Sequence, residues 1–334
     1  MSCAADSQLI AEYRLTDSDS ALIQSAIDAV LGEYAGASQA DFLRDAHRYF
    51  RLLPLPLLDL LTAFRDQEVA PAVLIRGFPV SDEEIGSTPR HWRDGPTGER
   101  QEIYSLVLAA SLGQVFAWAT LQNGRLVQDV VPIRGQQQAQ TGHGTIELAW
   151  HTEDGFHRYR CDYLCLFAMR NYDHIPTNLA CVDHLSLSPQ AVETLFTERF
   201  LIRPDTEHLS AEDPLARQVM ERMQDDPEPS AVLFGAPERP YLRIDPIYMS
   251  PLPGDAQAAA SLAEITRGLE ACLQPVSLEP GELLVLDNYR CVHGRAPFTA
   301  RYDGTDRWLK KVIVTRDLRK SRDVRGAVDD RVLN

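Results

Sequence analysis

The sequence predicts an α+β protein that is mainly β, with an N-terminal helical layer packed against an antiparallel sandwich or barrel. Up to about residue 116, most apolar residues recur at helical spacing. From residue 117 onward, short β-rich runs alternate with turns. No linker-like stretch separates the two parts, so the 334 residues are expected to form a single domain, 1–334.

Capping residues and apolar periodicity place the helices of the first part. We expect helices over 17–33, over 39–52, after Pro56, and over 99–116, the last of which stops near Gly113. The run "AVLIRGFPV" (72–80) is short, β-rich and closed by glycine and proline. It therefore predicts one buried strand within the helical layer of 1–116.

The second part, 117–323, holds the runs that we expect to form the β-core. They are "GRLVQDVVPI", "TIELAWHT", "DYLCLFAM", "NLACVDHL", "RFLIRPD", "SAVLFG", "PYLRID", "GELLVLDNY" and "WLKKVIVT". Helices near 189–199 and 255–272 interrupt them. The polar stretch 205–230 is expected to leave the sheet, either as a solvated surface helix and loop or as a mobile lid.

Composition argues against several kinds of partner. The net charge of −15 disfavours binding to nucleic acid or to anionic membranes. The first 15 residues lack the basic start and apolar run of a signal peptide, and the longest apolar stretches are too short to span a bilayer. The six cysteines show no metal-binding spacing and are typical of buried thiols in a reducing cytosol. We expect a cytoplasmic protein.

The stretch "AWHTEDGF" (149–156) places His151 and Glu153 two residues apart. On a strand, residues i and i+2 point to the same face, so the imidazole and the carboxylate would converge. The triplet H-x-E is weak by itself, because it often arises by chance in an acidic protein. A third ligand is offered by His293, which ends a strand-like piece just before Gly294 and can face a barrel mouth.

Two imidazoles and one carboxylate leave half of a coordination sphere open. This donor set suits non-haem Fe(II), which then binds a co-substrate and oxygen. A zinc hydrolase with two histidines and one glutamate is the chemical rival. It would need a further general base, as in H-E-x-x-H, and the sequence contains no such motif.

Arg307 follows His293 by fourteen residues, after the turn-like "DGTD" and at the start of "RWLKKVIV". A planar guanidinium in this position suits a bidentate carboxylate clamp. The alternative is a surface arginine paired with Asp303 or Asp306.

At this point the sequence resembles a known family. "WHTEDGFH", "DNYRCVHGRAPFTARYDGTDRWLKK", "TRDLRKSR" and "NGRLVQDVVPIRG" are similar to motifs of the clavaminate-synthase-like Fe(II)/2-oxoglutarate oxygenases. The resemblance is strongest to the asparagine and arginine β-hydroxylases of peptide-antibiotic biosynthesis. It implies a double-stranded β-helix, or jelly-roll, core with helices outside. The polar stretch 205–230 is then the candidate helical lid insertion.

The resemblance also implies roles for individual residues. His151, Glu153 and His293 would hold iron, and Arg307 would bind the distal carboxylate of 2-oxoglutarate, with Thr177 near the same carboxylate. Oxidative decarboxylation of 2-oxoglutarate by O₂ would yield succinate and CO₂ and hydroxylate an unactivated C–H bond. Because halogenases of this fold lose the carboxylate ligand, the retained Glu153 favours hydroxylation or desaturation.

The substrate-contacting positions match the family less well. Asp245 lies where relatives bind the polar end of the substrate side chain, although it is also typical of a turn before Pro246. Leu121 replaces a Gln or Glu that contacts the α-amino group, and strand alternation would point Gln122 to the other face. Lys311 replaces a second Arg, for the substrate carboxylate, and keeps its charge without the bidentate fork.

Ile247 stands where arginine hydroxylases carry a second aspartate. Together these departures predict a substrate other than plain free arginine or asparagine. The expected substrate is an amino-acid-like metabolite with a hydrogen-bond donor at its far end and a masked α-amino group, for instance one tethered to a carrier protein. Glu153 alone could also hold a free amine. The leading hypothesis is therefore a hydroxylase of specialised metabolism. A desaturase, a zinc hydrolase and an inactive binding module of the same fold are the alternatives.

Overall fold

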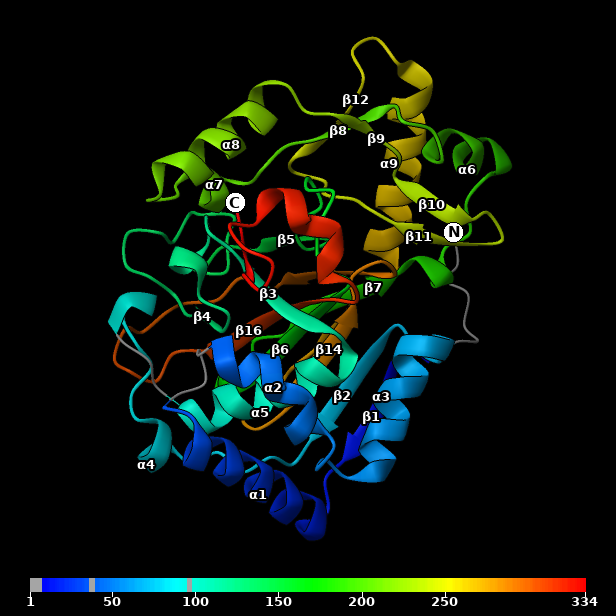
Figure 1. Ribbon diagram of the computed structural model, residues 1–334. Helices are drawn as coiled ribbons and strands as arrows, with labels where there is room; N and C mark the ends of the chain where they lie inside the picture. The colour runs from blue at the N-terminus through cyan, green and yellow to red at the C-terminus, as the bar shows by residue number, and fades with distance from the viewer. Residues whose placement is uncertain (1–7, 36–39, 95–97) are drawn as a thin grey trace.

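The computed structural model describes residues 8–35, 40–94 and 98–334. Helices pack beneath a large sheet, and a smaller sheet with its own helices lies on the opposite side (Figure 1). The α-helices are α1 (Asp17–Glu33), α2 (Ala40–Phe50), α3 (Leu55–Gln67), α4 (Asp82–Ile85), α5 (Glu99–Leu112), α6 (Pro189–Leu195), α7 (Thr206–Leu209), α8 (Pro214–Asp225) and α9 (Ala256–Ala271). Short 3₁₀ turns are η1 (Trp92–Asp94), η2 (Gln122–Gly124), η3 (Val182–His184) and η4 (Leu318–Val324).

The larger sheet has the strand order β1-β2-β14-β6-β16-β3-β17, with β4 also paired to β16. Its central strand β6 is antiparallel to both of its neighbours, β14 and β16, whereas β1 pairs with β2 in parallel. The bounds are β1 (Ile10–Arg14), β2 (Ala72–Arg76), β3 (Gln114–Trp118), β4 (Gln128–Val130), β6 (Tyr163–Arg170), β14 (Leu283–Asp287), β16 (Trp308–Thr315) and β17 (Val332–Leu333).

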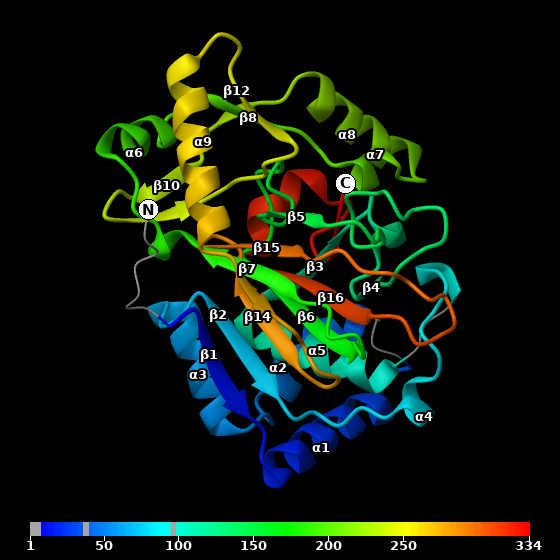
Figure 2. The same ribbon diagram turned by 180° about the vertical axis from the view of Figure 1, so that it is seen from behind.

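The smaller sheet has the order β13-β7-β15-β5 and is antiparallel throughout. Figure 2 shows β7 and β15 crossing above β6 and β16 of the larger sheet. The bounds are β5 (Leu148–His151), β7 (Thr177–Cys181), β13 (Gln274–Val276) and β15 (Cys291–Arg295). Two minor sheets are formed by β10 (Leu233–Ala236) with β11 (Arg239–Leu242), and by β8 (Phe200–Ile202), β9 (Pro229–Ser230) and β12 (Met249–Pro251).

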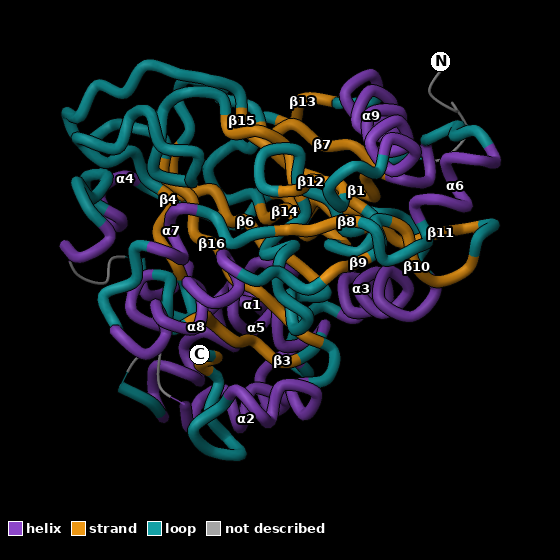
Figure 3. Tube along the Cα trace, turned by 90° about the horizontal axis from the view of Figure 1, so that it is seen from above, coloured by secondary structure: helices purple, strands orange, loops and turns teal. Residues whose placement is uncertain are grey.

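The larger sheet is buried on both faces because its side chains alternate between two cores. Val312 and Val314 of β16 pack toward the N-terminal helices, where α5 is enclosed by α1, α2 and α3. Leu309 and Ile313 of the same strand pack with residues of the smaller sheet, such as Leu179. Seen from above, helices flank the strands while loops gather over one end of β16 and β4 (Figure 3). Two facing sheets are consistent with the jelly-roll expectation.

The helices expected at 17–33, 39–52, after Pro56, 99–116, 189–199 and 255–272 are all present, within a few residues at their ends. The Thr16 side chain caps α1 in a capping box with Asp19. The sequence reasoning missed β1, whose five residues pair in parallel with β2. The segment 1–116 therefore also supplies strands β1 and β2 and part of β3 to the larger sheet. Among the described residues, no helix is long and apolar enough to cross a membrane.

Candidate metal centre and active-site pocket

His151 and His293 lie directly opposite each other on the antiparallel strands β5 and β15. Their ring centroids are 4.6 Å apart. Nδ1 of His151 lies 2.9 Å from the backbone carbonyl of Ala149, a contact that fixes the ring and directs Nε2 inward. The strand register therefore brings together two imidazoles that are 142 positions apart in the sequence, His151 and His293.

Glu153 reaches the two histidines from a turn, not from a strand. Strand β5 ends at His151, so the expectation that strand alternation aligns the H-x-E pair was wrong. Instead, the side chain of Asn288 fixes the backbone of Glu153. Its Oδ1 accepts from the Glu153 amide at 2.7 Å, and its Nδ2 donates to the Glu153 carbonyl at 3.0 Å. Both partners are buried, so the turn has little freedom.

Thr152, the spacer between the two ligands, has a role of its own. Its amide and its hydroxyl both donate to the carbonyl of Ile244, at 2.9 and 3.0 Å, and the Ile244 amide lies 3.1 Å from the same hydroxyl. These contacts hold the segment that carries Asp245 against the metal-binding motif. The β-branched residue therefore couples the metal site to one wall of the pocket.

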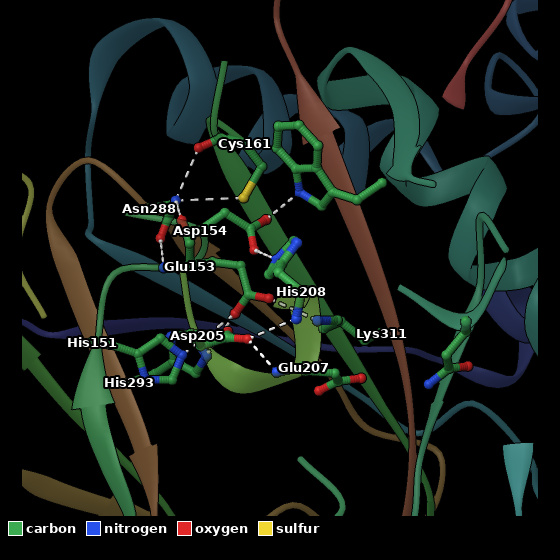
Figure 4. A network of polar contacts seen from close by, with 12 residues as sticks. His151, Glu153, Asp154, Cys161, Asp205, Glu207, His208, Asn288, His293 and Lys311 are labelled. Carbon is green, nitrogen blue, oxygen red and sulfur yellow. Dashed lines mark hydrogen bonds and ion pairs between the residues drawn. The ribbon is translucent and has the colours of Figure 1, made fainter. Parts of the chain in front are cut away.

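The three side chains form a compact donor set (Figure 4). Oε2 of Glu153 lies 3.7 Å from Nε2 of His151 and 3.3 Å from Nε2 of His293. One ligand atom from each residue lies within 4.8 Å of the others, and this is the one such cluster found in the described part of the chain. Two imidazoles and a carboxylate, with one side open to a pocket, fit a non-haem Fe(II) ion.

Lys311 of β16 approaches Glu153 from the opposite sheet (Figure 4). Its Nζ lies 2.7 Å from Oε1 of Glu153, whereas Oε2 is the oxygen that faces the two histidines. Burial opposes ionisation of Glu153, but Lys311 and the two imidazoles outweigh it and hold the pKa of this carboxyl well below its usual range. The carboxylate is therefore kept charged and oriented.

Arg307 lies just before β16 and is buried, with Nη2 3.3 Å from the Thr177 hydroxyl of β7. The alternative of a surface pair with Asp303 or Asp306 is wrong, because Arg307 is buried, its Nε has no hydrogen-bond partner, and the Asp306 carboxylate accepts from backbone amides instead. Burial, together with the nearby Arg295, lowers the pKa of Arg307 to about 9. A buried cation in a pocket with a free N–H group is suited to an anionic ligand.

Besides Glu153 and Asp154, three further carboxylates line the same pocket: Asp205, Glu207 and Asp245. Oδ1 of Asp245 accepts from the amides of Ile247 and Tyr248, so the residue does serve a turn. The residue also lines the cavity, and burial raises the pKa of its carboxyl. Asp205 and Glu207 come from the 205–230 segment, and the sequence reasoning missed both.

Leu121 and Gln122 lie in a turn after β3, and both line the pocket. The expectation that strand alternation separates them was wrong, because Gln122 and Asn123 adopt left-handed backbone conformations in η2. The Gln122 amide is fully engaged with the backbone of Asp129. Its Nε2 donates to the Asp129 carbonyl at 2.8 Å, and its Oε1 accepts from the Asp129 amide at 3.0 Å.

Comparisons with known proteins agree with this site. Residues 184–313 match the family described as "Taurine catabolism dioxygenase TauD, TfdA family". The enduracididine beta-hydroxylase of Streptomyces hygroscopicus is 38% identical, and the alignment covers 96% of this chain and 98% of the relative. The chain belongs to the TauD/TfdA family of dioxygenases. The L-ornithine/L-arginine 3-hydroxylase of Catenulispora acidiphila is 36% identical over the same shares of the two chains.

A solved structure extends this family assignment to the whole chain. The non-haem iron oxygenase OrfP, in complex with Fe, succinate and (3S)-hydroxy-L-Arg, superposes with a TM-score of 0.93 at 37% identity. The superposition covers 97% of this chain and 100% of OrfP. The family resemblance read from the motifs is confirmed. The chain is a non-haem iron hydroxylase that uses 2-oxoglutarate, and the zinc-hydrolase and inactive-module alternatives find no support.

Proposed function

We propose that the protein hydroxylates the β-carbon of a basic amino acid of the arginine class, as a step in specialised-metabolite biosynthesis. The observation that carries this proposal is the acidic wall of the pocket, formed by Asp205, Glu207 and Asp245. A guanidinium or ammonium group at the far end of a substrate side chain would find charge-assisted partners there. The names of the two similar hydroxylases support the same substrate class and the same carbon.

The distribution of charge supports one orientation of the substrate. Lys311, a cation that 2-oxoglutarate would not occupy, lies on β16, whereas the three carboxylates come from loops and from α7. A basic amino acid has its anionic group at one end and its cationic group at the other. It would therefore place its head group toward β16 and its side-chain terminus toward the loops. Arginine hydroxylases carry a second aspartate where this chain has Ile247. Asp205 and Glu207 would supply the negative charge that is missing at that position.

Different side chains of the pocket would bind the metal, bind 2-oxoglutarate and position the substrate. His151, Glu153 and His293 would hold Fe(II), with Lys311 and Asn288 fixing the glutamate. Arg307 and Thr177 would bind the distal carboxylate of 2-oxoglutarate. When bound, iron, 2-oxoglutarate and O₂ supply the oxidising chemistry, which converts 2-oxoglutarate to succinate and CO₂. The pocket walls position the substrate carbon and limit the entry of water.

The residues at the head-group end of the pocket are compatible with two forms of the substrate, one with a masked α-amino group and one that is a free amino acid. Leu121 offers no polar contact, which favours a masked α-amino group or a carrier-tethered amino acid. A free amino acid needs another partner for its ammonium group, and Glu153 is one. We favour the free form because OrfP, which superposes on nearly the whole chain, is in complex with a free amino acid, (3S)-hydroxy-L-Arg.

A substrate screen tests the proposal. The protein is reconstituted anaerobically with Fe(II) and 2-oxoglutarate, and O₂ is then admitted with L-arginine, L-homoarginine, L-ornithine or L-asparagine, or with N-acyl, amide and carrier-bound forms. Hydroxylated product is measured by mass spectrometry, and its position by NMR. Basic free amino acids should give the highest yield, with the new hydroxyl on C3. Preference for asparagine, or for a neutral side chain, would contradict the proposal.

A further inference from the structure

Gln128 of β4 is a buried polar residue that the described reaction does not use. Only 4% of its surface is exposed, and it lines the active-site pocket. No described residue forms a hydrogen bond with its side-chain amide. The amide of Gln122, in contrast, has both of its polar atoms engaged by backbone groups. A carboxamide at a pocket wall that no protein group engages has both its donor and its acceptor available to a ligand.

The neighbours of Gln128 define what such a ligand would be. Gln128 is the direct cross-strand partner of Lys311, so the two side chains lie side by side on one face. Asp129, the next residue of β4, points to the other face, where it accepts from the Trp308 indole at 2.7 Å. Lys311 in turn donates to Glu153 at 2.7 Å. The head-group end of the pocket therefore presents a cation, an anion and an amide together.

These three groups are complementary to the two charges of an α-amino acid. A carboxamide offers both a donor and an acceptor, whereas Lys311 offers only donors and Glu153 only acceptors. We infer that Gln128 binds the zwitterionic head group of the substrate, its Nε2 donating to the α-carboxylate and its Oε1 accepting from the α-ammonium. This inference rests on the proposed function and makes Gln128 the residue that selects free amino acids over masked ones.

The test compares variants against head-group analogues of the substrate. The iron-loaded enzyme is assayed with the basic amino acid that the wild type hydroxylates best, with its N-acetyl form and with its α-carboxamide. Gln128→Leu removes both hydrogen-bonding functions, and Gln128→Glu keeps the acceptor but repels a carboxylate. Gln190→Leu, on the exposed surface of α6, is the matched control. To check that the site of each variant is intact, binding of 2-oxoglutarate to the Fe(II) enzyme is measured by absorption spectroscopy under anaerobic conditions.

Gln128→Leu should raise KM for the free amino acid at least tenfold, with a smaller effect on kcat. It should also reduce the preference for the free over the N-acetyl form by a similar factor. Gln128→Glu should shift preference toward the α-carboxamide. Equal losses with all three substrates would overturn the inference, because a merely structural residue would act in that way. If the wild type hydroxylates no amino acid, both the proposed function and this inference fail. If the wild type is active and Gln128→Leu is unchanged, the inference alone fails.

Discussion

His208 Nε2 lies 3.0 Å from Oδ1 of Asp154, the residue that directly follows the metal-binding Glu153. His208 is fully buried, and its Nδ1 lies 2.6 Å from the Thr120 hydroxyl. The other oxygen of Asp154 accepts from the Trp118 indole at 2.5 Å. Asp154 itself has a left-handed backbone, with φ of 50°. The 205–230 segment is thus tied through one buried imidazole to the turn that presents Glu153 (Figure 4).

His208→Ala is expected to loosen the 205–225 segment and weaken substrate binding. Leaving the buried carboxylate of Asp154 without this partner costs on the order of 1–3 kcal/mol. Hydrogen exchange of α7 and α8 should accelerate by roughly tenfold or more, and KM for the amino acid should rise. Arg222→Ala, at an exposed position of α8, is the control. Exchange rates that match the wild type would show that His208 does not hold the segment.

The same segment is predicted to gain order when substrate binds. Asp205 and Glu207 line the pocket, so a cationic substrate would add contacts that the free protein lacks. Hydrogen exchange of 205–225, measured with Fe(II) and 2-oxoglutarate before and after addition of the substrate, should slow. Equal protection in both states counts against a lid.

His151→Ala, Glu153→Ala and His293→Ala are each expected to abolish iron-dependent turnover. Each change removes one of the three donor atoms that lie within 4.8 Å of one another. Product formation and bound iron are measured, with His47→Ala, at an exposed site on α2, as the control. Retention of iron by Glu153→Ala without hydroxylation is compatible with the assignment. Full activity in any of the three variants is not.

Arg307→Ala is expected to raise the 2-oxoglutarate requirement and leave iron affinity nearly unchanged. Loss of a charged hydrogen-bonding partner in a desolvated site costs on the order of 2–5 kcal/mol, or roughly thirtyfold or more in affinity. Titration of 2-oxoglutarate into the anaerobic Fe(II) protein measures this directly. Arg301→Ala removes an exposed guanidinium that pairs with Asp173 and serves as the control. An unchanged 2-oxoglutarate affinity would mean that another residue forms the clamp.

The metal ligands could be predicted from the sequence because each sits in a local pattern. H-x-E is a contiguous triplet, and His293 lies in a strand-like run just before a glycine. The expectation that His293 ends its strand was wrong, because β15 continues through Gly294 to Arg295. The geometry that unites them could not be predicted, because it depends on long-range contacts. The position of Glu153 is fixed by Asn288, which is 135 residues away in the sequence.

The pocket walls were harder to predict for the same reason. Asp205 and Glu207 lie in polar sequence that is equally typical of a solvated surface, and only the docking of His208 brings them to the site. The two faces expected for Leu121 and Gln122 were wrong, because the strand ends before them and a left-handed turn replaces the alternation. Local patterns therefore predicted chemistry well and side-chain direction poorly.

Asp287→Asn is expected to stabilise the protein above neutral pH and to flatten its pH dependence. Burial raises the pKa of Asp287 to about 7, although its Oδ1 accepts from the Tyr289 amide at 2.9 Å. The usual value is 3.8, so between about pH 4 and pH 7 the folded protein binds more protons than the unfolded chain. Stability is then lost as pH rises through this window, by an amount on the order of 4 kcal/mol.

Asparagine cannot ionise, and it keeps an oxygen that can accept from the Tyr289 amide. The variant and the wild type should therefore unfold at similar urea concentrations near pH 4. There the folded wild-type carboxyl is neutral, and the pH is close to the ordinary pKa of 3.8 in the unfolded chain, so ionisation has cost little stability. Near pH 8 the wild type carries a buried charge, and the variant should be more stable by a few kcal/mol. Asp59→Asn, at an exposed position of α3, controls for the loss of one negative charge. A stability difference that stays constant from pH 4 to pH 8 would show that Asp287 is ionised throughout.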